Sequence, residues 1–203
     1  MVSALQEAQN GGKPFPAEKF VNKIPVKKHD HVLIPAGTVH CSGADTMVLE
    51  ISATPYIFTF KLWDWGRVDL DGKPRPIHLE HGAANIQWYR NTEWVHKNLI
   101  NAVAEVYSDE NGTVVRTGLH EREFLDTFRF TTSSALPVHR NGSVHMLNLV
   151  DGTRAVLRSK SDAFPPLELH YAETCIVPQA AGDYEIYSPD GSEVKVILAC
   201  VRN

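Results

Sequence analysis

This sequence of 203 residues has few cysteines, no long apolar run and no excess of positive charge. The three cysteines, Cys41, Cys175 and Cys200, are odd in number and far apart, which argues against disulfides and thiolate zinc sites and predicts a reducing, cytoplasmic setting. No run is long enough to cross a bilayer, and the first residues lack the regions of a signal peptide, so we expect no membrane association. Twenty basic against twenty-four acidic residues predict no nucleic-acid partner.

Short runs rich in Val, Ile, Thr, Tyr and Phe recur from residue 31 onward, separated by Gly, Pro, Asp and Asn. Strands at this spacing are typical of an all-β sandwich or barrel. Asp151-Gly152 and Asp190-Gly191 each lie between two runs and predict hairpins. The predicted strands are His31–Ile34, Thr46–Ser52, Tyr56–Trp63, Thr113–Thr117, Thr127–Thr132, Val144–Val150, Thr153–Arg158, Leu167–Tyr171, Glu173–Val177, Asp183–Tyr187 and Glu193–Val201.

Helical patterns occur at the N-terminus and in the middle of the chain. We predict a helix from Ser3, a break at Gly11-Gly12 and a second short helix at 17–21, then a connecting helix at 92–100 with an acidic first turn. These elements suggest a boundary near 90–105. We predict a first domain at 1–95, with too few strands to close a sandwich by itself, and a complete second domain at 96–203.

One local motif carries metal chemistry. Pro35, Gly37 and His40 form the pattern P-x-G-x-x-H after a predicted strand, which is the second half of the cupin signature. In cupins the proline and glycine shape a turn, and the histidine points into the barrel, where an imidazole can ligate a divalent metal. A surface turn with an incidental histidine is the alternative reading.

The residues that follow this motif resemble the type I mannose-6-phosphate isomerases, which are zinc-dependent cupin enzymes. V-L-E-I-S at 48–52, F-T-F-K-L-W-D-W-G-R-V-D at 58–69 and G-K-P-R-P-I-H-L at 72–79 carry the resemblance. Trp63 and Trp65 replace two tyrosines of the family pattern, and Gly66 replaces an aspartate. The resemblance is strong over 25–82 and continues weakly to the end, where family members have a second cupin without metal. It therefore implies a cupin-type double-stranded β-helix, or jelly roll.

The resemblance also implies roles for individual residues. It makes His40 the last of four zinc ligands, Glu50 an acid/base group and Lys61 the counterpart of an arginine that holds the sugar phosphate. Lysine keeps the charge but lacks the bidentate fork of arginine. Arg67 is a further candidate catalytic residue. The alternatives are an outward strand residue for Glu50, a solvated strand end for Lys61 and a structural ion pair for Arg67.

Two other residues of the block, Arg75 and His78, are expected to fix its loop. The other zinc ligands of the family, a glutamine, a histidine and a glutamate, have no match among the 39 residues before His40. His29 and His31 are possible replacements, because alternate residues of a strand share a face. We expect no metal at the downstream histidines His139, His145 and His170.

Three functions follow from these patterns. The first is isomerisation of mannose 6-phosphate to fructose 6-phosphate, in which zinc polarises the substrate oxygens and Glu50 moves a proton between C1 and C2. The second is a non-catalytic cupin module, such as a truncated isomerase, a sugar-binding subunit or an assembly subunit. The third is other metal chemistry at His29, His31 and His40. The predicted partners are a sugar phosphate and a second copy of the chain, which covers the incomplete first cupin.

Overall fold

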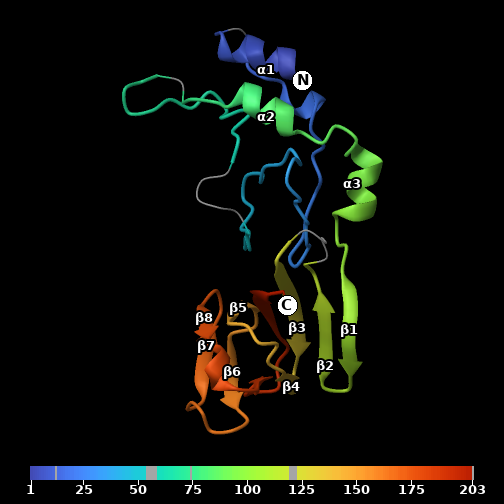
Figure 1. The fold of residues 1–203 in the computed structure, drawn as a ribbon, viewed down its shortest axis with the longest axis vertical. Helices are drawn as coiled ribbons and strands as arrows, with labels where there is room; N and C mark the ends of the chain where they lie inside the picture. Colours follow the sequence, from blue (N-terminus) through green and yellow to red (C-terminus); the bar gives the residue numbers. More distant parts are fainter. Residues whose placement is uncertain (12, 54–58, 74, 119–122, 203) are drawn as a thin grey trace. The chain divides into compact units, whose positions relative to one another are not determined.

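The computed structural model describes residues 1–11, 13–53, 59–73, 75–118 and 123–202 (Figure 1). The chain divides into two compact units, Met1–Ile100 and Asn101–Asn203. Each unit has its own buried cluster of apolar side chains, so we describe each by itself.

The second unit consists of two antiparallel sheets (Figure 1). Six strands form one sheet in the order β1-β2-β3-β10-β5-β8, and four form the other in the order β4-β9-β6-β7. The strands are β1 (Ala104–Asp109), β2 (Gly112–Arg116), β3 (Leu125–Thr132), β4 (Ala135–Val138), β5 (His145–Asp151), β6 (Arg154–Ser159), β7 (Leu167–His170), β8 (Thr174–Val177), β9 (Tyr184–Tyr187) and β10 (Val194–Val201).

The core of this unit follows from the alternation of side chains along the strands. In β10, which pairs with β3 on one side and β5 on the other, Val194, Val196 and Leu198 are buried, while the intervening Lys195 and Ile197 are only partly covered. Leu147 and Leu149 of β5 and Leu136, Leu157 and Ile186 of the other sheet complete the same apolar cluster.

The two predicted hairpins are wrong in their pairing, although both turns exist. Gly152 and Gly191 have φ of 87° and 78°, a backbone conformation that suits glycine. The strands on either side of each turn, however, lie in different sheets: β5 and β10 belong to the six-stranded sheet, whereas β6 and β9 belong to the other. An Asp-Gly pair reverses the chain locally, but which strands then pair depends on tertiary contacts.

Sequence patterns missed β1 and β4. β1 is exposed along its whole length, and β4 is a strand of four residues that contains Pro137. The pairing of β1 with β2 shifts register between Glu105 and Tyr107, so Val106 is a bulge residue. Neither segment is a sustained run of Val, Ile, Thr, Tyr and Phe of the kind that the predictions used.

The first unit contains short helices around a small apolar cluster of Leu5, Phe15 and Leu79. The helices predicted at the N-terminus and at 92–100 are confirmed, and the Asn91 side chain caps the latter by accepting a hydrogen bond from the Trp94 amide at 3.0 Å. Helices in the described part of the chain all fall short of the length and apolarity needed to span a bilayer. The elements are α1 (Val2–Gln9), η1 (Ala17–Lys19), α2 (Leu79–Asn85) and α3 (Thr92–Asn98).

The strands predicted in the first unit are wrong within its described residues. Residues 31–34, 46–52 and 59–63 belong to no strand, and Val32 forms only an isolated antiparallel bridge with Ile100. Residues 56–58 of the third predicted strand lie outside the described residues. A strand forms only where a partner satisfies its backbone hydrogen bonds, and a propensity pattern cannot supply that partner.

Candidate functional site

The loop from Lys61 to His78 brings together the charged residues of the isomerase-like block. The Asp64 carboxylate, whose side chain is only 12% exposed, forms ion pairs with Lys61 Nζ at 3.4 Å and with Arg75 Nε at 3.0 Å. Two cations thus share one carboxylate, and each keeps N–H donors that a single carboxylate does not occupy. Because both cationic side chains are partly exposed, the cluster offers positive charge to an anion such as a phosphate.

The prediction that Arg75 and His78 fix this loop is confirmed. The His78 amide donates to the Lys61 carbonyl at 2.7 Å, and the Lys61 amide donates to Nδ1 of His78 at 3.2 Å. The Arg75 amide donates to the Arg67 carbonyl at 3.1 Å, in addition to the ion pair with Asp64. Arg67 takes part in the loop through its backbone, while its side chain is exposed.

The loop rests on α2, a helix that sequence patterns missed. A Cβ added to Gly82 would lie 2.5 Å from Cδ2 of Leu62, so a larger residue at this position would force the Leu62 side chain to move. Glycine inside a helix weakens the helical signal, and His78 at the N-cap makes no side-chain capping bond. Close packing therefore explains both the helix and the failure to predict it.

The turn of the P-x-G-x-x-H motif is present. Gly37 has φ of 83°, and the Thr38 amide donates to the Pro35 carbonyl at 3.2 Å. His40 follows as an exposed side chain, with Nδ1 at 2.8 Å from the Thr38 carbonyl oxygen. A carbonyl only accepts, so Nδ1 carries the hydrogen, and Nε2 is the ring atom with a lone pair in the neutral form.

Arg90 braces this turn, a role that no sequence motif indicated. Its Nη1 donates to the carbonyls of Pro35 at 3.0 Å and Ala36 at 2.7 Å and to Oγ1 of Thr38 at 2.6 Å. The guanidinium also lies 5.3 Å from the ring centroid of Trp94. More than fifty residues separate Arg90 from the turn in sequence, so only the folded chain reveals the contact.

The other proposed site residues of the first unit do not gather around His40. Glu50 is exposed, and neither a hydrogen bond nor an ion pair joins it to His40 within the described ranges. The premise that His29 and His31 share the face of a strand is wrong, because His29 lies in a turn with φ of 71°. Within the residues that the structure describes, no group of three or more His, Cys, Asp and Glu side chains could hold a metal ion. The residues present therefore do not fit the zinc that the resemblance implies.

The second unit contains a buried histidine held by polar neighbours. His145 has Nδ1 at 2.9 Å from the Tyr184 hydroxyl and Nε2 at 3.1 Å from Oδ1 of Asn141. The Ser143 amide also donates to this oxygen, which fixes the amide orientation and places the imidazole hydrogen on Nε2. Burial, and then the charge of Arg140, lowers the pKa of His145 to about 4. The ring is therefore neutral at physiological pH, and both of its nitrogens are occupied.

The other two downstream histidines, His139 and His170, each interact with a carboxylate and, among the described residues, not with His145. His139 pairs with Asp183 at 2.9 Å through Nδ1, and the hydrogen bond from His139 lowers the pKa of that carboxyl. His170 pairs with Glu173 at 3.1 Å, and hydrogen bonds from the His170 amide and then its side chain lower the pKa of Glu173. Each histidine therefore has a structural partner of its own.

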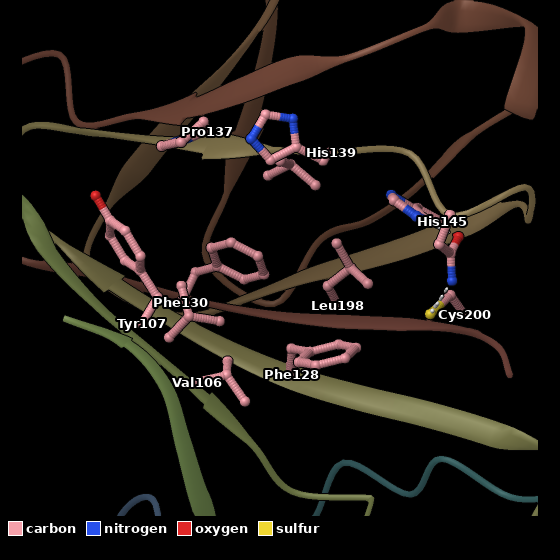
Figure 2. A pocket seen from close by; sticks show the side chains of 12 residues that line it. Val106, Tyr107, Phe128, Phe130, Pro137, His139, His145, Leu198 and Cys200 are labelled. Atoms are coloured by element: carbon pink, nitrogen blue, oxygen red, sulfur yellow. Dashed lines mark hydrogen bonds between the residues drawn. The ribbon is translucent and has the colours of Figure 1, made fainter.

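A cavity of about 280 Å³ opens within the second unit (Figure 2). Aromatic and aliphatic side chains form most of its wall, and Figure 2 shows Tyr107, Phe130 and Leu198 around the space, with His139 on β4's side of it. The buried group of His145 and Cys200 lies at one end, where the Asn141 amide donates to Sγ of Cys200 at 3.2 Å. Burial, the largest influence, raises the pKa of the Cys200 thiol.

Among known proteins, the chain is similar in sequence to proteins named mannose-6-phosphate isomerase. "Mannose-6-phosphate isomerase" from Streptococcus mutans is 35% identical over 63 residues, which cover 31% of this chain and 20% of that protein. "Mannose-6-phosphate isomerase ManA" from Bacillus subtilis is 22% identical over 135 residues, which cover 66% of this chain and 40% of that protein. The chain thus spans less than half the length of these curated relatives. No protein-family model matches the sequence.

A solved structure supports the fold. The mannose 6-phosphate isomerase of Bacillus subtilis superposes with a TM-score of 0.50 at 13% identity, covering 69% of this chain and 39% of that one. At this identity the likeness concerns the fold alone. The mainly β-sheet structure, with its antiparallel sheets and short helices, confirms the predicted all-β, cupin-type jelly roll. The resemblance to part of a mannose-6-phosphate isomerase is likewise confirmed.

Proposed function

We propose that this isomerase-like cupin chain interconverts mannose 6-phosphate and fructose 6-phosphate, and that its loop from Lys61 to His78 binds the phosphate of the sugar. The observation that carries the proposal is the cluster in which Lys61 and Arg75 share the carboxylate of Asp64. The cluster lies in the block that resembles the mannose-6-phosphate isomerases, and the relatives with that name support the assignment.

In this proposal the cations of the loop bind the phosphate and a carboxylate moves the proton. Asp64 holds Lys61 and Arg75 in place, and their remaining donors bind phosphate oxygens, with Arg67 as a further cation on the same loop. Glu50 is the group that transfers a proton between C1 and C2 through an enediol. Since the described residues do not fit zinc, no step of this mechanism passes through a metal.

A non-catalytic cupin module that binds sugar phosphate is the second candidate. The exposure of His40 and Glu50 favours it, because a proton transfer at carbon needs a reacting group that is shielded from water. Both candidates share the anion-binding loop and differ in whether the chain produces fructose 6-phosphate.

Titration with mannose 6-phosphate tests the shared part of the proposal. Lys61→Ala removes one of the two paired cations, and we expect about a tenfold loss of affinity, which corresponds to ~1.4 kcal/mol. Lys73→Ala, an exposed lysine of the same loop outside the Asp64 cluster, is the matched control and should bind like the wild type. Equal affinity in the Lys61 and Lys73 variants, or no binding by the wild type, would contradict the proposal.

An assay for fructose 6-phosphate then separates the two candidates. Product formation by the chain that Glu50→Gln abolishes, with mannose 6-phosphate still bound, supports the isomerase. Binding without product supports the module.

We further propose that a second copy of the chain covers the incomplete first unit, and that the protein is cytoplasmic. The run Met47, Val48 and Leu49 supports the assembly, because three consecutive apolar side chains are exposed. The three cysteines support the location, because all of them are free thiols.

A further inference from the structure

We propose that the cavity of the second unit binds a small, uncharged aromatic molecule that carries a hydroxyl group. This proposal concerns Asn101–Asn203 and is independent of the proposed function, which rests on the loop of the first unit. The argument uses the wall of the cavity, the bulge at its edge and the polar groups that remain unoccupied.

The residues that line the cavity disfavour a charged ligand. The cavity measures about 280 Å³, near the lower limit of ordinary ligand pockets, and the described residues that line it include no Lys, Arg, Asp or Glu. Phe128, Phe130 and Leu198 are among the apolar side chains that line it (Figure 2). An anionic sugar phosphate would lose its hydration here without gaining a cation, whereas an aromatic ring would bury its apolar surface.

The bulge in β1 adds two adjacent side chains to the same wall. In a regular strand Val106 and Tyr107 would point to opposite faces, because successive side chains alternate. The register shift between Glu105 and Tyr107 breaks this alternation, and both side chains line the cavity. Bulges of this kind re-aim side chains near functional sites. Both residues remain partly exposed, so the edge of the cavity is accessible from solvent.

We assign the polar contact of the ligand to Nε2 of His139, a lining residue whose side chain is 78% exposed. Both nitrogens of His145 are occupied, and the Tyr107 hydroxyl donates to Asp109 at 2.6 Å. The Asp183 carboxylate accepts from Nδ1 of His139, so Nε2 of a neutral His139 is an acceptor. No hydrogen bond to that Nε2 occurs within the described parts of the chain. An acceptor beside an apolar wall matches a ligand that donates one hydroxyl hydrogen.

Fluorine NMR with 4-fluorophenol and fluorobenzene tests this site. We expect 4-fluorophenol to bind the wild type and Val106→Trp, which fills the edge of the cavity, to weaken binding at least tenfold. Glu105→Trp is the matched control, because it places the same side chain one residue away on the same strand, outside the lining, and should change affinity less than twofold. Circular dichroism verifies that both variants keep the sheets.

A second measurement identifies the hydroxyl contact by comparing two ligands that differ in this group alone. The wild type should prefer 4-fluorophenol over fluorobenzene about tenfold, and His139→Ala should remove this preference while fluorobenzene still binds. Absence of 4-fluorophenol binding at millimolar concentration would overturn the proposal. Equal binding by the wild type and the folded Val106→Trp variant would overturn it as well. An unchanged preference in His139→Ala would reject the assigned polar group.

Discussion

Val196 and Leu198 of β10 in the second unit are buried in the apolar core, whereas Val48 and Leu49 in the first unit are exposed although they have the same strand-forming character. The difference lies in what surrounds each segment. β10 has a hydrogen-bonded neighbour on both sides, while residues 46–52 belong to no strand. A β-branched or aliphatic run is stable as a strand only when other strands satisfy its backbone and bury its side chains. The described part of the first unit has strand-forming residues at 46–52 but no neighbouring strand that pairs with them.

The largest effect that would sharpen this comparison is expected from Leu147→Ala. Leu147 has 0% exposure in the core of the second unit, and the cavity left by the substitution should lower the free energy of unfolding by about 2–5 kcal/mol. Met146→Ala is the matched control. The two residues are neighbours in β5, but the Met146 side chain is exposed and its loss should cost less than ~1 kcal/mol.

Two spectroscopic signals follow the units separately in this experiment. All four tryptophans, Trp63, Trp65, Trp88 and Trp94, belong to the first unit, so their fluorescence reports that unit, while far-ultraviolet circular dichroism reports the sheets. Leu147→Ala should lower the urea midpoint of the dichroism signal and leave the fluorescence midpoint in place. An equal shift of both midpoints would mean that the units unfold together, and the comparison between them would fail.

Acidification is expected to lower the stability of the second unit by a smaller amount. Burial, followed by the charge of Arg140, lowers the pKa of His145 to about 4 from 6.5, its ordinary value in the unfolded chain. The unfolded state therefore binds more protons between these values, and the stability that the neutral ring contributes is complete above pH ~6.5 and declines as the pH falls towards ~4. By pH ~5 the second unit should lose about 2 kcal/mol.

Urea unfolding of the wild type and of His145→Gln at neutral pH and at pH ~5 measures this effect. The variant should lose less stability on acidification, since glutamine does not titrate. If both proteins lose the same amount, the acid sensitivity comes from other groups. The tryptophan signal of the first unit serves as the internal reference.

The smallest effect concerns the exposed apolar run of the first unit. If a second copy covers Val48, which is 63% exposed, the particle mass should be twice 22.6 kDa by light scattering. Val48→Ser should then raise the dissociation constant about tenfold, equivalent to ~1.4 kcal/mol of lost apolar burial. Val26→Ser, at another exposed valine of the same unit, should have no such effect. A monomer over a wide concentration range would contradict the assembly.

Local patterns were sufficient for those parts of the fold that depend on neighbours in sequence. Runs rich in β-branched and aromatic residues predicted most strands of the second unit, and an acidic first turn followed by apolar residues three and four apart predicted α3. The pairing across Gly152 and Gly191 depended on the other sheet, and α2 depended on the contact between Gly82 and Leu62, so neither could be inferred from local sequence.

The residues of the candidate site also divide into those that local sequence predicts and those that depend on contacts between distant residues. Arg75 and His78 were identified because they belong to one contiguous block. Arg90 was missed because its contact with the turn at Pro35 crosses more than fifty residues. The bulge at Val106 was also missed, because residues 104–109 are not a run of strand-forming residues and were not predicted as a strand.

The central position of β10 in the six-stranded sheet also sets an order of assembly. β10 comes after the other strands of its sheet in the sequence, yet it is the strand that joins β3 to β5. Without β10, the remaining pairings would join β1, β2 and β3 in one ribbon and β5 and β8 in another, and the edges of β3 and β5 that pair with β10 would be open. During synthesis the sheet therefore closes only after β10 has emerged, and until then the two edges flanking its position are open to other strands.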